Sequence, residues 1–211
     1  MSDDTARPAS RRREQTRARL LDAAHEVFAE VGMDAASVEM ICERAGFTRG
    51  AFYSNFESKD ELFLALVRHL AEAKIEEVAG RVRELDHATM SDPADLVRQV
   101  VGASIGEQME PQLISEIRAQ ALRDPRLGAA YLAWQDAMRL RVEGIIDYVV
   151  ERFGLHLRLP AGEAAQLLLD VSEDTCTRAT LEGRTQTEIT GQLNARLGLL
   201  VGALVDSPAQ V

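Results

Sequence analysis

The stretch from Ser37 to Phe56 reads SVEMICERAGFTRGAFYSNF, and it decides the expected fold. Ser37 and Thr48 are residues that favour helix N-caps, so each predicts the start of a short helix. Gly46 lies between these helices, where its tolerance of positive φ allows a tight turn. The spacing therefore predicts a helix-turn-helix.

The second predicted helix has one side suited to the interior and one suited to a partner. The inward positions of the whole stretch are Val38, Ile41, Phe47, Phe52 and Phe56. The outward positions are Thr48, Arg49, Gly50, Ala51, Tyr53 and Ser54. Small residues at 50 and 51 would let this helix lie deep in a major groove, where Arg49 can form two parallel hydrogen bonds to guanine. These features favour a DNA-reading helix.

Phosphate contacts are predicted for Thr48, Tyr53, Asn55 and Lys59, because their side chains can donate hydrogen bonds to the DNA backbone. The alternative is an ordinary helical hairpin, since acids on the first helix, Glu39 and Glu43, would be unfavourable near phosphates.

The charge distribution bears on this choice more than the net charge of −10 does. Between residues 7 and 19 there are six arginines and a single acid, Glu14, whereas beyond residue 60 there are 15 basic and 23 acidic residues. A basic end on an acidic body suits a molecule of which only one end meets DNA. The cluster Arg11–Arg13 is expected to contact phosphates or a minor groove, with a solubilising tail as the alternative.

The segment Leu20–Leu66 closely resembles the N-terminal domain of TetR/AcrR-family regulators. The matching pieces are LDAAHEVFAEVG at 21–32, SV at 37–38, ICERAGFTRGAFYSNF at 41–56 and KDELF at 59–63. The resemblance implies a three-helix DNA-binding domain and a helical C-terminal domain that binds an effector and dimerises. Carried over by position, the DNA-contacting residues are Ser37, Thr48, Arg49, Gly50, Tyr53, Asn55 and Lys59.

The rest of the chain is predicted to be helical, giving an all-α protein of about nine helices. The expected parts are an arm at 1–10, a DNA-binding domain at 11–57 and an effector-binding and dimerisation domain at 58–211. No convincing strand is predicted, because helical spacing of apolar residues recurs nearly everywhere. Later helices are expected to start near Pro93, Pro111, Pro125, Glu163 and Gln186.

The last helix, about 186–205, is apolar on more than one side. Its main stripe is Ile189, Leu193, Leu197, Leu200 and Leu204, with further apolar residues off that stripe. Together with the helix at about 163–182 it is expected to pack against the same pair in a second copy, which would give a homodimer. A helix wholly internal to one chain is the alternative.

An effector pocket is harder to predict, because apolar residues at helical spacing are usually plain core. The candidates are His69, Met109, Trp134, Gln135, Met138, Asp174, Thr177 and Arg178. Asp174 and Arg178 could instead pair with each other at i,i+4, and His69 could be exposed.

Other functions find little support in the sequence. The four histidines are scattered, and no metal spacing, serine elbow or phosphate loop is found, so no enzymatic activity, cofactor or metal is expected. Cys42 and Cys176 are expected to be buried free thiols, with a redox switch as the alternative. No signal peptide or membrane span is predicted, which indicates a cytoplasmic protein.

The expected function is a ligand-responsive repressor that a small molecule releases from a palindromic, double-stranded DNA operator. The alternative is a DNA-binding or nucleoid protein of the same fold without an effector. An enclosed apolar cavity in the C-terminal domain would favour the first.

Overall fold

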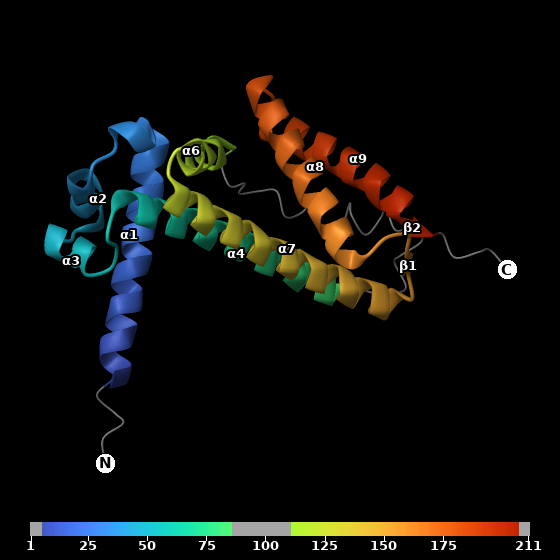
Figure 1. Ribbon diagram of the computed structural model, residues 1–211, viewed down its shortest axis with the longest axis horizontal. Coiled ribbons are helices and arrows are strands. Elements are labelled where there is room, and N and C mark those ends of the chain that lie inside the picture. Colours follow the sequence, from blue (N-terminus) through green and yellow to red (C-terminus); the bar gives the residue numbers. More distant parts are fainter. Residues whose placement is uncertain (1–5, 86–110, 207–211) are drawn as a thin grey trace, which may run out of the picture. The chain divides into compact units, whose positions relative to one another are not determined.

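The computed structural model describes residues 6–85 and 111–206, which form eight α-helices and one pair of short strands (Figure 1). The prediction of an all-α protein is confirmed. The helix expected to begin near Pro93 lies outside the described residues. The helices are α1 Ala6–Ala35, α2 Val38–Ala45, α3 Arg49–Tyr53, α4 Lys59–Glu84, α6 Pro111–Ala121, α7 Pro125–Phe153, α8 Ala161–Leu181 and α9 Gln186–Leu204.

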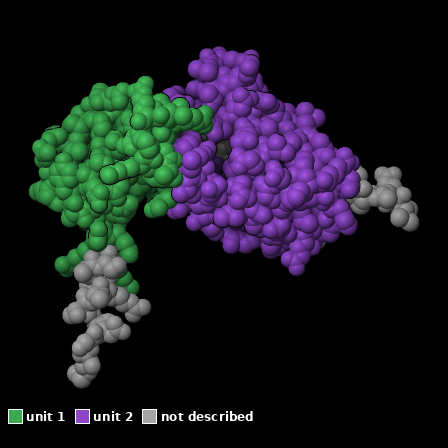
Figure 2. Space-filling view, in the orientation of Figure 1, with its two compact units in different colours: residues 1–69, 116–130 green, residues 70–115, 131–211 purple. Residues whose placement is uncertain are grey.

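The chain divides into two compact units (Figure 2). Unit 1 comprises residues 1–69 and 116–130, and unit 2 comprises residues 70–115 and 131–211. Helices α4, α6 and α7 therefore each contribute residues to both units. The expected domain boundary at 57–58 stays a prediction, and α1 already begins at Ala6, within the segment expected to be an arm.

Unit 1 has an aromatic core under the helix-turn-helix. Phe52, Phe56 and Phe63 are fully buried. The rings of Phe28 and Phe63 meet edge to face, with centroids 5.1 Å apart, which is a favourable arrangement for two aromatic rings. This core joins α1, α3 and α4, so it holds the short α3 in place although five residues are too few for an independently stable helix.

Unit 2 is built from the later part of α4 together with α7, α8 and α9. Val82 and Leu85 pack with Val149 of α7 in one buried cluster. Leu193 and Leu197 of α9 pack against α8 in a second cluster, and these two helices run side by side in Figure 1. Unit 2 is thus held by helix-to-helix apolar packing.

The expectation that the chain has no strand is wrong at one place. β1 (His156–Leu157) pairs antiparallel with β2 (Val205–Asp206), and the Arg158 side chain bonds Asp206 across the pair at 2.7 Å. Two residues are too short to show an alternating pattern, so the sequence carries no signal for such a pair.

Local capping signals set several helix ends as predicted. Pro111 and Pro125 begin α6 and α7, and a complete capping box between Thr185 and Glu188 begins α9. A capping box at residues 58–61, before α4, is only half formed. The Ser58 hydroxyl accepts from the Glu61 amide at 3.0 Å. The Glu61 carboxylate, however, accepts from the backbone amide of Glu57 and not from that of Ser58.

Candidate nucleic-acid interface and ligand cavity

The turn between α2 and α3 depends on one glycine. Gly46 has φ 69° and ψ 34°, the left-handed conformation that costs other residues free energy. In this conformation the amide of Gly46 bonds the carbonyl of Glu43, and that of Phe47 bonds the carbonyl of Cys42 at 2.9 Å. The carbonyls at the end of α2 are satisfied, and the chain reverses within three residues into α3.

The hydroxyls of Ser37 and Thr48 cap α2 and α3 as predicted. Ser37 accepts from the amide of Met40 at 3.2 Å, and Thr48 accepts from the amide of Ala51 at 3.3 Å. A hydroxyl that accepts one hydrogen bond still carries its own O–H donor. Both residues can therefore cap a helix and donate to a phosphate oxygen.

The outward side of α3 is open. The Arg49 side chain is 60% exposed, Tyr53 is 50% exposed, and Ala51 is half-buried. A Cβ added at Gly50 would meet only the Thr48 hydroxyl, at an ordinary contact distance of 3.7 Å. The fold itself does not need a glycine at position 50, whereas a close approach to a groove would benefit from one.

Arg49 is held by an acid from the preceding helix. Its guanidinium lies 2.5 Å from the Glu39 carboxylate and 5.8 Å from the centre of the Tyr53 ring. Hydrogen bonding to Tyr53 and the charge of Glu39 raise the pKa of Arg49, so the side chain stays charged. The sequence analysis noted Glu39 only as unfavourable near phosphates, because residues in different helices show no pairing signal.

Asn55 lies inside unit 1, away from the exposed side of α3. It is only 8% exposed, and its Nδ2 donates to the Ala51 carbonyl at 2.8 Å and to the Ser54 hydroxyl. A DNA contact through this side chain would require it to give up both bonds. In this conformation Asn55 instead satisfies a carbonyl at the C-terminal end of α3.

Lys59 is also engaged within the protein. Its Nζ donates to the carbonyl oxygens of Met33 at 2.7 Å and Ala36 at 2.9 Å, where α1 ends. Gly32, with φ 77°, kinks α1 just before these carbonyls. A cation at the C-terminal end of a helix is electrostatically favourable, so this arrangement joins the start of α4 to the end of α1.

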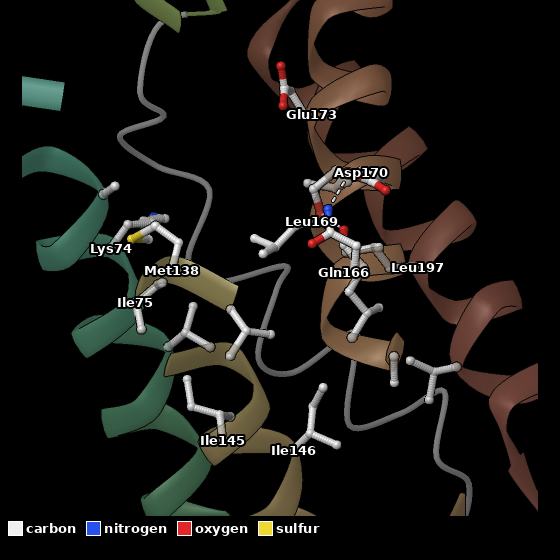
Figure 3. Close-up of a pocket in the computed structure, with 18 of the residues that line it drawn as sticks. Lys74, Ile75, Met138, Ile145, Ile146, Gln166, Leu169, Asp170, Glu173 and Leu197 are labelled. Carbon is white, nitrogen blue, oxygen red and sulfur yellow. Dashed lines mark hydrogen bonds between the residues drawn. The ribbon is translucent and has the colours of Figure 1, made fainter. Parts of the chain in front are cut away.

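A cavity of about 460 Å³ lies within unit 2, between α4, α7, α8 and α9 (Figure 3). Figure 3 shows Ile75, Ile145, Ile146, Leu169 and Leu197 around it. Its volume falls in the range of small-molecule sites, roughly 300–1,000 Å³, and its walls are mostly aliphatic, as in most such sites.

Four of the predicted pocket residues line this cavity, namely Trp134, Gln135, Met138 and Thr177. Three others do not. His69 is exposed and belongs to unit 1, Arg178 is exposed on α8, and Asp174 bonds Arg196 of α9 at 2.9 Å instead of pairing with Arg178. The last candidate, Met109, lies outside the described residues.

The comparisons with known proteins agree with this architecture. A family profile described as "Bacterial regulatory proteins, tetR family" matches residues 20–66, which hold α2, α3 and the flanking parts of α1 and α4. The HTH-type transcriptional regulator UidR of Escherichia coli is 29% identical over 117 residues, which are 54% of this chain and 56% of that protein. A protein from Mesorhizobium loti assigned to the TetR family of transcriptional regulators superposes with a TM-score of 0.72 at 20% identity, covering 93% of this chain and 99% of that one.

Residues 20–66 are those of a TetR-family regulator's N-terminal domain.

Sequence similarity within this family is concentrated at the N-terminal end. The chain is matched over only about half the length of UidR. Bacillus subtilis FadR, solved in complex with stearoyl-CoA, shares the fold across 89% of this chain and 98% of its own, with a TM-score of 0.64, but at 20% identity. The relatives are transcriptional regulators and not enzymes, in agreement with the prediction for this chain. Among the helices of residues 6–85 and 111–206, none is long and apolar enough to cross a membrane.

Three arginines of α1 have an internal role that the sequence alone does not reveal. Arg19 donates to the Ala45 carbonyl at 2.8 Å, at the end of α2. Arg13 and Arg17 donate to the carbonyls of residues 54 and 55, just after α3. The Arg17 guanidinium also lies 4.2 Å from the centre of the Phe56 ring. Of these arginines only Arg13 belongs to the cluster expected to contact phosphates, and all three donate to carbonyls at the ends of α2 and α3.

The two cysteines are free thiols, and Cys42 is buried as predicted. Burial and the neighbouring Glu39 raise the pKa of the Cys42 thiol, so little of it is the reactive thiolate. Cys176 is only partly buried and lines the cavity.

Proposed function

We propose that this chain is a DNA-binding transcriptional regulator of the TetR family that reads its operator with α3. The observation that carries this proposal is the open side of α3, where Arg49 and Tyr53 project from a capped helix within the segment that matches the family profile. In this proposal Arg49 reads bases, while the hydroxyls of Ser37, Thr48 and Tyr53 contact phosphates. Asn55 and Lys59 hold the helices instead of the DNA.

The regulator is further proposed to act as a homodimer through α8 and α9. Leu167, Leu181 and Leu199 of these helices are exposed large apolar residues, and Cβ atoms added at Gly191 and Gly202 would meet open space. A two-fold partner would cover this apolar surface. It would also supply the second recognition helix that a palindromic operator needs, with half-sites about 34–36 Å apart.

A small-molecule effector is proposed to occupy the cavity of unit 2. The alternative, a DNA-binding protein of this fold without an effector, would not need an apolar cavity of about 460 Å³. A protein of the same fold, FadR, is known with stearoyl-CoA bound, so the fold tolerates a ligand with a long apolar part.

Repression and its release follow from a shift between two conformations. In this proposal the effector binds one conformation more tightly than the other, and the spacing of the two α3 helices differs between them. Helix α4 is the proposed lever, because its first residues belong to unit 1 and its later residues line the cavity. In an activator the same movement of α4 would occur, but the effector would favour the conformation that fits the operator.

Salt-dependent binding tests the DNA-reading role. The purified chain is titrated by fluorescence anisotropy against a duplex from upstream of its own gene and against a scrambled duplex, between 50 and 200 mM salt. We expect the log of both affinities to fall linearly with the log of salt concentration, and the native duplex to bind about 10³-fold or more tightly than the scrambled one. Equal binding of the two duplexes would contradict the proposal.

A charged residue placed on the proposed dimer interface tests whether the chain dimerises there. Leu199 is 78% exposed on α9, and we expect Leu199→Glu to weaken dimerisation by about tenfold or more, because each copy would bury an unpaired carboxylate. Leu140→Glu is the matched control, since Leu140 is 58% exposed on α7, outside the proposed surface. Sedimentation equilibrium that finds monomeric wild type, or equal effects of the two changes, would argue against this interface.

A further inference from the structure

Arg49 of α3 is restrained from two sides before any partner binds. The carboxylate of Glu39, from α2, lies 2.5 Å from its guanidinium, measured between Oε1 and Nη1. The ring of Tyr53, one turn further along α3, has its centre 5.8 Å from the guanidinium. A guanidinium carries five N–H donors, so contact with one carboxylate and one ring leaves donors for a base edge. Because a long side chain loses conformational entropy when it binds, restraint in advance reduces that loss.

Stability alone gives little reason for an acid at position 39. The side chain of Glu39 is 57% exposed and that of Arg49 is 60% exposed, so both lie on the same open surface. An acid on a DNA-binding surface repels phosphates, while an exposed ion pair contributes little to the stability of a fold. Glu39 lies in the first turn of α2, where an acid interacts favourably with the helix dipole, so a purely structural role is the alternative.

The ion pair of Glu39 and Arg49 should respond differently to different base pairs. Guanine presents O6 and N7, two acceptors that match one edge of a guanidinium. A base pair without these acceptors leaves Arg49 with Glu39 alone, and the two side chains together bring no net charge to the phosphates. On guanine, the arginine gains two hydrogen bonds and keeps the attraction of the carboxylate, which strengthens as water is excluded from the groove. Glu39 therefore lowers the affinity for other sequences more than the affinity for a site with guanine.

We propose that Glu39 is a specificity-determining residue, which holds Arg49 ready to meet guanine and disfavours base pairs that do not satisfy this arginine. The inference rests on the proposed reading of DNA by α3 and names how that site selects one base pair. Glu39 acts through Arg49 and not through a contact of its own with the bases, so it is a positioning residue. The selected partner is the G·C pair that Arg49 contacts in each half-site.

Glu39→Gln tests this role, because it removes the charge and keeps the length of the side chain. Affinity is measured by fluorescence anisotropy at one salt concentration, for the operator, a scrambled duplex and duplexes with each operator base pair changed in turn. We expect about threefold tighter binding of the scrambled duplex, since an acid near the phosphates is gone. We also expect the preference for guanine at the pair read by Arg49 to fall by about fivefold or more, with the preferences at other pairs unchanged.

Two further variants isolate the effect. Arg49→Ala identifies the contacted base pair as the one whose replacement no longer matters, and adding Glu39→Gln to it should leave that base profile unchanged. Glu43→Gln is the matched control, since Glu43 is an exposed acid one turn further along α2 that makes no ion pair with any residue the structure describes. It should tighten the binding of every duplex alike and keep the preference for guanine. Circular dichroism of each variant checks folding.

Three outcomes would overturn the inference: an unchanged preference for guanine in Glu39→Gln, an equal loss of preference at every base pair, or the same loss in Glu43→Gln. The first is also the result expected of a purely structural role in α2. A wild-type chain that discriminates the operator, with a Glu39→Gln variant of the same base profile, would contradict only this inference. A wild-type chain that binds the operator and the scrambled duplex equally would contradict the proposed DNA-reading function itself.

Discussion

Arg49→Ala should weaken operator binding by about 1–3 kcal/mol and relax the preference for one base pair in each half-site. The guanidinium is the group on the exposed side of α3 that can bond guanine at two atoms, and it stands clear of the core. Binding is measured by anisotropy against the operator and against variants with each base pair changed in turn. The expected loss is about 5-fold to 150-fold on the operator and little on the variant that lacks the contacted pair.

Two further variants separate charge from base reading. Arg49→Lys keeps the charge but loses the paired geometry, so it should retain the salt dependence and lose most of the base preference. Glu39→Gln removes the carboxylate that lies 2.5 Å from Arg49, and should strengthen binding to any duplex at low salt because an acid near phosphates is gone. Operator affinity that is unchanged in Arg49→Ala would remove Arg49 from the base-reading role.

Lys59→Met should lower the free energy of unfolding by about 1.5–3 kcal/mol, because two carbonyl oxygens at the end of α1 lose a charged donor. Methionine keeps much of the length of the side chain, so packing changes little. Urea unfolding followed by circular dichroism measures the loss as a lower midpoint at unchanged slope. The reason is local: Met33 directly follows the kink at Gly32, and Ala36 directly follows the last residue of α1, so both carbonyls lie at the end of this helix.

Arg12→Met provides the comparison for Lys59, since Arg12 is an exposed cation of α1. It should leave stability unchanged and, if the basic segment meets phosphates, reduce the salt slope of DNA binding by about one. The opposite pattern for Lys59, unchanged stability with a reduced salt slope, would restore the phosphate contact predicted from sequence and refute the internal role that its two hydrogen bonds indicate.

The helix-turn-helix could be predicted from sequence because its signals are local. Ser37, Gly46 and Thr48 act on backbone groups no more than four residues away, and the structure has all three in the expected conformations. The inner apolar positions follow from helical spacing alone. Local interactions therefore suffice to predict the helix-turn-helix, which also lies within the segment that the family profile matches.

The remaining roles depend on partners distant in sequence. Lys59 reaches carbonyls 23 and 26 residues away, and Asp174 bonds Arg196 instead of its helical neighbour Arg178. Asn55 is turned inward by bonds to its own helix, which a position-by-position comparison with relatives does not reveal. Only four of the eight residues predicted for the pocket line the cavity, because polar residues in apolar helices indicate a pocket only when the packing places them in it.

The arginines of α1 determine how large a piece of this protein would be needed to move its DNA specificity onto another scaffold. Arg13, Arg17 and Arg19 bond the carbonyls that follow α2 and α3, and Lys59 bonds the end of α1. Grafting residues 37–56 alone would leave those carbonyls without donors and α3 free to tilt. The smallest transferable reading module therefore runs from about residue 13 to residue 59, with the basic segment of α1 as its internal frame.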